Sequence, residues 1–81
     1  MPTSVNYAVA QRIKELLQQK KITQYRLAMN SGLTHSTIKN IMHDTIKDCH
    51  LSTIILIASG FDMTVSEFLD SPLFNEDNLN I

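Results

Sequence analysis

One short pattern occurs three times in the chain and constrains its fold more than any other feature. In each copy an apolar residue precedes a threonine, and a second apolar residue follows four positions after that threonine. A threonine in this position can accept a hydrogen bond from an amide of a helix's first turn, and the flanking apolar pair can pack as a hydrophobic staple. The copies are Ile22-Thr23 with Leu27, Leu33-Thr34 with Ile38, and Met63-Thr64 with Phe68. They predict three helix starts, and Glu67 completes a capping box at the third.

The ends of these three helices follow from the residues beyond them. Gly32 can adopt the left-handed conformation that closes a helix, so the second helix is expected over residues 24–31. The third is expected over 35–43. The fifth is expected over 65–70, because Pro72 disfavours its continuation.

Two further helices are predicted from hydrophobic periodicity. Residues 7–20 carry an apolar stripe at helical spacing. Residues 51–61 are apolar on almost every side, which predicts a central and buried helix. The N-cap of that helix is either Asp48 or His50, and Asp62 stands after it where glycine is commoner. The stripe of the first helix consists of Val9, Ile13, Leu16 and Leu17.

The predicted fold is all-α, a compact five-helix domain. Eighty-one residues leave room for one domain, and only two glycines and two prolines argue against a turn-rich β fold. We expect an N-terminal arm over residues 1–6, the domain over 7–70 and a C-terminal tail over 71–81. The apolar tail residues Leu73, Phe74, Leu79 and Ile81 either contact a second copy or fold back over the core. The expected core is Ile13, Leu16, Leu27, Ala28, Leu33, Ile38, Ile41, Ile54, Ile57, Ala58 and Phe68.

Charge is distributed unevenly along the chain. Residues 1–47 hold all seven lysines and arginines and two acidic residues, whereas residues 48–81 hold six acidic residues and no lysine or arginine. The first part is therefore suited to an anionic partner and the second is not. A dipolar domain with solvated charges on both faces is the plainer interpretation of the same split.

Several classes of function lack sequence support. Cys49 is the single cysteine, and with His43 and His50 it does not supply the ligands of a structural zinc site. No glycine-rich phosphate loop or nucleophile elbow is present, so we expect no enzyme, no metal, no cofactor and no small-molecule ligand. The longest apolar run, Ile54–Ala58, is far too short to span a bilayer. Without a secretory signal, the expected location is the cytoplasm.

The second and third predicted helices are joined by only Ser31-Gly32-Leu33. Such a short connection forces two helices to cross steeply, as in a helix-turn-helix. Ala28 supplies a small residue where the helices approach one another. Ile38 and Ile41 anchor the third helix to the core, which leaves Ser36, Asn40 and His43 on its opposite side.

In these features the sequence resembles the phage-repressor (Cro/cI-like, XRE-type) helix-turn-helix domain family. The resemblance runs from about Val9 to Leu69, and His35 stands where the family often has arginine. Four segments carry it in order: residues 12–17, 22–28, 32–38 and 57–69. The resemblance implies a lambda-repressor-like fold in which the second and third helices form the helix-turn-helix and the third enters the major groove.

The resemblance also implies a site. The expected base-reading residues are Thr34, His35, Ser36, Thr37, Lys39 and Asn40, and the expected phosphate contacts are Gln24, His43 and Lys47. Asparagine can pair with adenine, and histidine can donate to guanine. The implied protein is a transcriptional regulator of a prokaryote or phage, a repressor that binds double-stranded DNA as a homodimer. The alternative is a protein-interaction module on the same fold, such as an antitoxin or adaptor, which the acidic second part and the apolar tail would favour.

Overall fold

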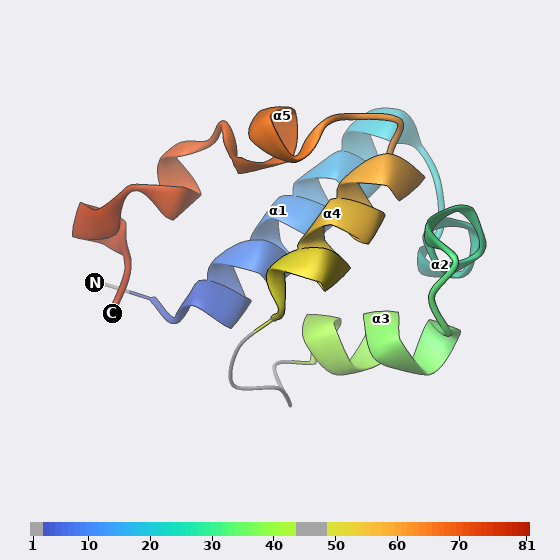
Figure 1. Ribbon diagram of the computed structural model, residues 1–81, viewed down its shortest axis with the longest axis horizontal. Coiled ribbons are helices and arrows are strands. Elements are labelled where there is room, and N and C mark those ends of the chain that lie inside the picture. The colour runs from blue at the N-terminus through green and yellow to red at the C-terminus, as the bar shows by residue number, and fades with distance from the viewer. Residues whose placement is uncertain (1–2, 44–48) are drawn as a thin grey trace.

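The computed structural model describes residues 3–43 and 49–81, and the regular structure in this part of the chain is helical (Figure 1). The packing follows a simple order: α2 lies against α4, α3 against both α1 and α2, and α5 against α4. The all-α, five-helix fold expected from the sequence is confirmed. The elements are α1 (Val5–Lys20), α2 (Gln24–Ser31), α3 (His35–Met42), α4 (Leu51–Gly60), α5 (Val65–Leu69) and two short 3-10 turns, η1 (Pro72–Phe74) and η2 (Glu76–Asn78).

The three threonine caps form as predicted. The hydroxyl oxygens of Thr23, Thr34 and Thr64 each accept a hydrogen bond of 3.0–3.1 Å from the amide three residues later. The Glu67 carboxylate in turn accepts from the Thr64 amide at 2.9 Å, which completes the capping box. Because the ionised form is the better acceptor, the bonds from the Thr64 amide and then from its hydroxyl lower the pKa of Glu67.

Both ends of α2 match the expectation, whereas each of the other four helices departs from it at one end, by one or two residues. Ser4 caps α1 through a bond from the Tyr7 amide, so α1 begins at Val5 rather than at residue 7. Gly32 is left-handed with φ 71°, as predicted, and Asp62 takes φ 59° after α4. His50 is the N-cap of α4 without a side-chain bond; the alternative, Asp48, lies outside the described residues. The ends predicted at residues 43, 61 and 70 each fall one residue earlier.

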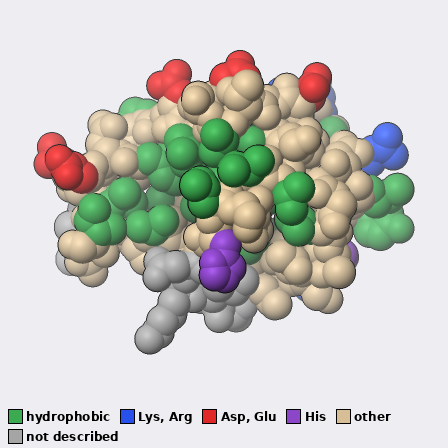
Figure 2. Space-filling view, in the orientation of Figure 1, with side chains coloured by type: hydrophobic (Ala, Val, Ile, Leu, Met, Phe, Trp, Pro, Cys, Tyr) green, Lys and Arg blue, Asp and Glu red, His purple; other side chains and the backbone are tan. Residues whose placement is uncertain are grey.

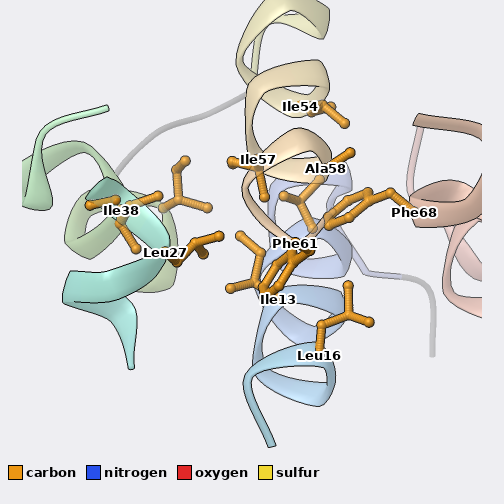
Figure 3. Close-up of a cluster of buried hydrophobic side chains, with 12 residues drawn as sticks. Ile13, Leu16, Leu27, Ile38, Ile54, Ile57, Ala58, Phe61 and Phe68 are labelled. Atoms are coloured by element: carbon orange, nitrogen blue, oxygen red, sulfur yellow. The ribbon is translucent and has the colours of Figure 1, made fainter. Parts of the chain in front are cut away.

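The core lies where α1, α4 and α5 meet α2 and α3 (Figure 3). Ten of the eleven expected core residues are buried. The expectation for Leu33 is wrong: it is only half-buried, because it lies in the turn between α2 and α3. Val9, already part of the predicted stripe, and Phe61, at the end of α4, complete the buried cluster.

The expectation that α4 is a central and buried helix holds for one side of it only. Ile54, Ile57 and Ala58 face the core, whereas Leu51 and Ile55 lie on the outer side and are 62% and 46% exposed. Leu56 is likewise exposed. We call Leu51, Ile55 and Leu56 the apolar stripe of α4; the exposed Ser52 and Ser59 lie among them. Figure 2 shows hydrophobic side chains at the surface over α4.

The tail folds back on its own chain. Thr3 and Leu79 form a β-bridge, in which the Thr3 amide donates to the Asn78 carbonyl at 3.0 Å and the Asn80 amide donates to the Thr3 carbonyl at 2.7 Å. The first described residue, Thr3, therefore lies beside the C-terminal segment of the chain (Figure 1). Closer to the domain, the Phe74 ring packs on Phe68 with centroids 6.1 Å apart.

Arg12 joins α1 to α5. Its Nε donates to the Phe68 carbonyl at 2.7 Å and its second terminal nitrogen donates to the Glu67 carbonyl at 3.0 Å. Both carbonyls belong to the last turn of α5, where a helix leaves carbonyls without intrahelical partners. The Glu67 carbonyl also accepts from the amide of the capping residue Asp70 at 3.2 Å. Arg12 therefore stabilises the packing of α1 on α5. Its charge belongs to the basic part of the sequence, but its guanidinium group is engaged within the protein.

Candidate nucleic-acid interface

The turn between α2 and α3 fixes how α3 is presented. The left-handed Gly32 reverses the chain, and the Leu33 amide donates back to the Ala28 carbonyl at 3.1 Å. Ala28 is buried, which lets the two helices approach closely at this point. Ile38 and Ile41 are fully buried beneath α3. The helix is therefore anchored along one side and offers the other side to a ligand.

Predicted base-reading side chains occupy the outer side of α3. His35, Ser36, Lys39 and Asn40 are exposed, and none of them is acidic. Short polar groups on an accessible helix suit the donor and acceptor groups of the DNA major groove. The structure thus brings these four residues together on one accessible surface.

Thr34 and Thr37 also lie at the start of α3, but their hydroxyls serve the helix itself. The two oxygens are 2.9 Å apart and share a hydrogen bond, and Thr34 also accepts from the Thr37 amide. Thr37 is half-buried. Their first role is therefore to hold the first turn of α3.

Predicted phosphate contacts converge on a cleft between three helices. Gln24, the first residue of α2, and His43, directly after α3, both line it, although they lie far apart in sequence. The cleft has a volume of about 410 Å³, and none of the described residues that line it carries a carboxylate. Gln24 also marks a helix start, where backbone amides without helical partners favour an anion. Lys47, the third predicted contact, lies outside the described residues.

α1 contributes polar residues to this cleft that the sequence analysis did not select. Gln11, Lys14 and Gln18 line it opposite Gln24 and His43. Their spacing of three and four residues places them on one side of α1, which is the signal that could have found them. Lys14 adds a cation from α1, a helix from which no contact residue was predicted.

Asn6 is a second residue that the sequence analysis missed. It is fully buried, and its side-chain amide donates to the carbonyl of Ile41 in the last turn of α3 at 3.5 Å. Its carbonyl oxygen accepts from the thiol of the half-buried Cys49 at 3.1 Å. Asn6 thus ties the end of α3 to α1. A polar residue three positions before Val9, in line with the apolar stripe, is the signal that could have found it.

Acidic side chains lie away from α3 on the visible face. Figure 2 shows them along the upper edge and at the left end of the molecule, whereas α3 lies at the lower right in the same orientation. Glu15 is the only acidic residue in the described helices α1 to α3. The electrostatic field around α3 is therefore favourable to an anionic ligand.

Metal-binding clusters and membrane-spanning helices are both absent from the described residues. Within residues 3–43 and 49–81, no three histidine, cysteine, aspartate or glutamate side chains come together in a way that could hold a metal ion. Among the described helices, none combines the length and the apolar character needed to cross a bilayer.

Comparison with known families finds a match over most of the chain. Residues 12–72 match the family described as the Cro/C1-type HTH DNA-binding domain. The chain is also 32% identical to the HTH-type transcriptional regulator PuuR of Escherichia coli strain K12 over 80 residues. That alignment covers 89% of this chain but only 43% of PuuR, so the chain spans less than half the length of this relative.

Solved structures show the same arrangement of helices. Prophage Lp1 protein 11 superimposes with a TM-score of 0.79 at 28% identity, covering 93% of this chain and 97% of that protein. The restriction-modification controller protein C.AhdI from Aeromonas hydrophila gives 0.69 at 27% identity, covering 78% and 94%. Both likenesses extend over nearly the whole length of the other protein.

Proposed function

The chain belongs to the family of Cro/C1-type helix-turn-helix DNA-binding domains, and on that premise we propose that it is a sequence-specific transcriptional regulator, a repressor, that binds double-stranded DNA. The observation that carries the proposal is the outer side of α3, which is exposed, polar and free of carboxylates above a fully buried apolar side. The similarity to a curated transcriptional regulator supports it. We place its action in the cytoplasm of a bacterium or of a phage-infected cell, and we assign it no catalysis, cofactor or small-molecule ligand.

We assign base reading to the exposed residues of α3. Asn40 can bond both the N6 amino group and N7 of an adenine, and His35 can donate to guanine N7 or O6. Ser36 and Lys39 lie beside them on the same side of the helix. Thr34 and Thr37 contact the bases from the start of the helix. Their methyl groups can make apolar contacts, and their hydroxyl oxygens can still accept hydrogen bonds beside the one that they share.

We assign phosphate binding to the cleft between α1, α2 and α3. Gln24, His43 and Lys14 reach its surface from three different helices or helix ends. Contacts of this kind set the register of a protein on the duplex without reading sequence. Lys47, beyond α3, is expected to add a further phosphate contact.

The test of base reading is selection of bound DNA from a random pool. The wild-type protein should enrich one motif, and Ser36→Ala with Asn40→Ala should lose the preference at particular base pairs. The matched control is Ser66→Ala with Asn75→Ala, which removes the same chemical groups from exposed positions outside α3. A motif that survives the α3 changes, or is lost in the control, would contradict the assignment.

We further propose that the regulator is a homodimer joined through the apolar stripe of α4. One α3 reads only a few base pairs, and two half-sites about 34 Å apart are the usual solution. Leu51, Ile55 and Leu56 are exposed together, and α4 contains no charged residue. Two copies can therefore meet across a twofold axis without placing like charges opposite one another. A second copy covering this stripe would also keep it from water.

The C-terminal tail offers a control position for testing whether the apolar stripe of α4 forms the dimer contact. Ile81 is 83% exposed, whereas Phe74 and Leu79 already pack on their own chain. Sedimentation equilibrium should show Ile55→Glu shifted toward monomers and Ile81→Glu unchanged. The opposite result would place the dimer contact on the tail.

The alternative function is a protein-interaction module. The exposed apolar stripe of α4, which supports the homodimer, would equally suit contact with a different protein. The two proposals differ in their use of α3. A gel shift with DNA fragments from the protein's own operon region separates them, because the interaction module requires no DNA complex. Dependence of such a complex on Asn40 would favour the regulator.

A further inference from the structure

An exposed aromatic side chain lies against the start of α3. Tyr25 is the second residue of α2, and its ring meets the ring of His35, the first residue of α3. The centroids are 5.8 Å apart and the planes are inclined by 84°, an edge-to-face arrangement. This geometry brings the electropositive edge of one ring to the electronegative face of the other. Tyr25 is nevertheless 61% exposed, so burial in the core does not explain its position.

The backbone of His35 and its ring are held by different groups. Thr34 caps the helix and fixes the main chain at this point through its bond from the Thr37 amide. That cap leaves the side-chain torsions of His35 undetermined, and a ring that rotates freely would lose entropy on meeting a base. The contact with Tyr25 restricts the ring before DNA arrives. The other ring contact in the described part of the chain, Phe68 with Phe74, joins α5 to the tail.

We propose that Tyr25 is a positioning residue for His35, which makes selectivity at the base pair read by His35 depend on a side chain of α2. The inference rests on the proposed function, since it requires His35 to read DNA. Pre-orientation of this kind raises discrimination because a correctly held donor meets one base edge and misses another. A phosphate contact by the Tyr25 hydroxyl would act differently, by strengthening binding to every sequence alike.

The first measurement needs no DNA. In NMR spectra of the free protein, the ring protons of His35 should show a ring-current shift caused by Tyr25. Tyr25→Phe keeps the aromatic ring and should retain this shift, whereas Tyr25→Leu should abolish it. Because Tyr25 is exposed, both variants are expected to fold, and the remaining spectrum serves as the internal check. An unchanged His35 spectrum in Tyr25→Leu would overturn the ring contact in solution.

The second measurement is a double-mutant cycle on DNA specificity. Tyr25→Leu should lose selectivity at the same base pair as His35→Ala, by on the order of tenfold, a size typical of one base contact. The double variant should lose no more than His35→Ala alone. Tyr25→Phe should keep the wild-type preference. Met29→Leu, at an exposed position one turn further along α2, is the matched control and should also keep it.

Other outcomes decide against the proposal in distinct ways. Equal weakening on all DNA sequences, shared by Tyr25→Phe, would assign the Tyr25 hydroxyl to a phosphate. Additive losses in the double variant would show that the two residues act independently. A wild-type protein without any sequence preference would refute the proposed function itself, and the NMR comparison would then still show whether Tyr25 orients His35.

Discussion

Gly60 and Ser31 approach so closely that the glycine cannot carry a side chain without displacing its neighbour. A β-carbon on Gly60 would overlap the hydroxyl oxygen of Ser31, and it would also lie 3.0 Å from a methyl group of Leu27. Gly60 is the last residue of α4 and Ser31 the last residue of α2. This contact sets how closely α4 packs on α2, and thereby helps to place the helix-turn-helix on the core.

Gly60→Ala should lower the free energy of unfolding by about 1–3 kcal/mol, the usual cost of overpacking a close contact. Ser31→Ala alone should be nearly neutral or stabilising, because the buried Ser31 hydroxyl has no hydrogen-bond partner among the described residues. Urea unfolding of the single and double variants tests this. Gly60→Ala should cost less in the Ser31→Ala background, and an equal cost in both backgrounds would contradict the contact.

Arg12→Lys should destabilise the protein by about 1–2 kcal/mol, because lysine cannot reproduce two hydrogen bonds to adjacent carbonyls with one planar group. Arg12 makes these bonds to Phe68 and Glu67. Thermal unfolding gives the stability, and a gel shift well below the unfolding transition gives the affinity. DNA affinity should stay close to wild type. Loss of affinity without loss of stability would identify Arg12 as a phosphate contact instead.

The capping box should make stability fall in acid. The pKa of Glu67 is lowered from its ordinary value of 4.5, so its ionised form is favoured by folding. The stabilisation is complete above that value and is lost as the pH falls through the lower pKa of the folded state. Unfolding temperatures measured from pH 6 downward should therefore drop less steeply in Glu67→Gln than in the wild type. Parallel curves for both proteins would contradict this contribution.

Local signals in the sequence were sufficient for much of this fold. The three threonine caps and the left-handed Gly32 depend on residues within a few positions of each other, and all formed as predicted. The exposed side of α4 was not predictable in this way. Ile54 and Ile55 are the same residue type, and only the placement of the other helices decides which of them is covered.

In the candidate site, too, some features could be predicted from local sequence and others depend on how the helices pack. The outer side of α3 follows from helical periodicity, so the exposure of Ser36 and Asn40 was predictable. The contact of Tyr25 with His35 and the bond from Asn6 to Ile41 join different helices. No spacing rule within one helix specifies such pairs, because they depend on the crossing of two helices.

The salt dependence of DNA affinity should distinguish phosphate contacts from base contacts. Lys14→Ala should weaken binding to all DNA sequences and reduce the slope of log affinity against log salt by about one. Gln24→Ala should also weaken binding uniformly, but with little change in slope, because a neutral amide releases no counterion. Asn40→Ala should change preference at particular base pairs. Titrations at several salt concentrations test all three, and a Lys14→Ala slope equal to wild type would remove Lys14 from the interface.

Charge-reversing substitutions should reduce DNA affinity strongly on α3 and only slightly at the acidic C-terminal end. Lys39 lies on the exposed side of α3, so Lys39→Glu should place a carboxylate against phosphate and reduce affinity by on the order of tenfold or more. Asp70→Lys, Glu76→Lys and Asp77→Lys change exposed residues around α5 and the tail. Acidic side chains on the visible face lie away from α3 (Figure 2), and charges separated by more than about 10 Å are largely screened at 0.1 M salt. The triple variant should therefore alter affinity far less than Lys39→Glu alone. If the C-terminal reversals changed affinity as much as Lys39→Glu, the acidic end would lie beside the ligand, and the protein-interaction module would replace the DNA-binding regulator as the better explanation.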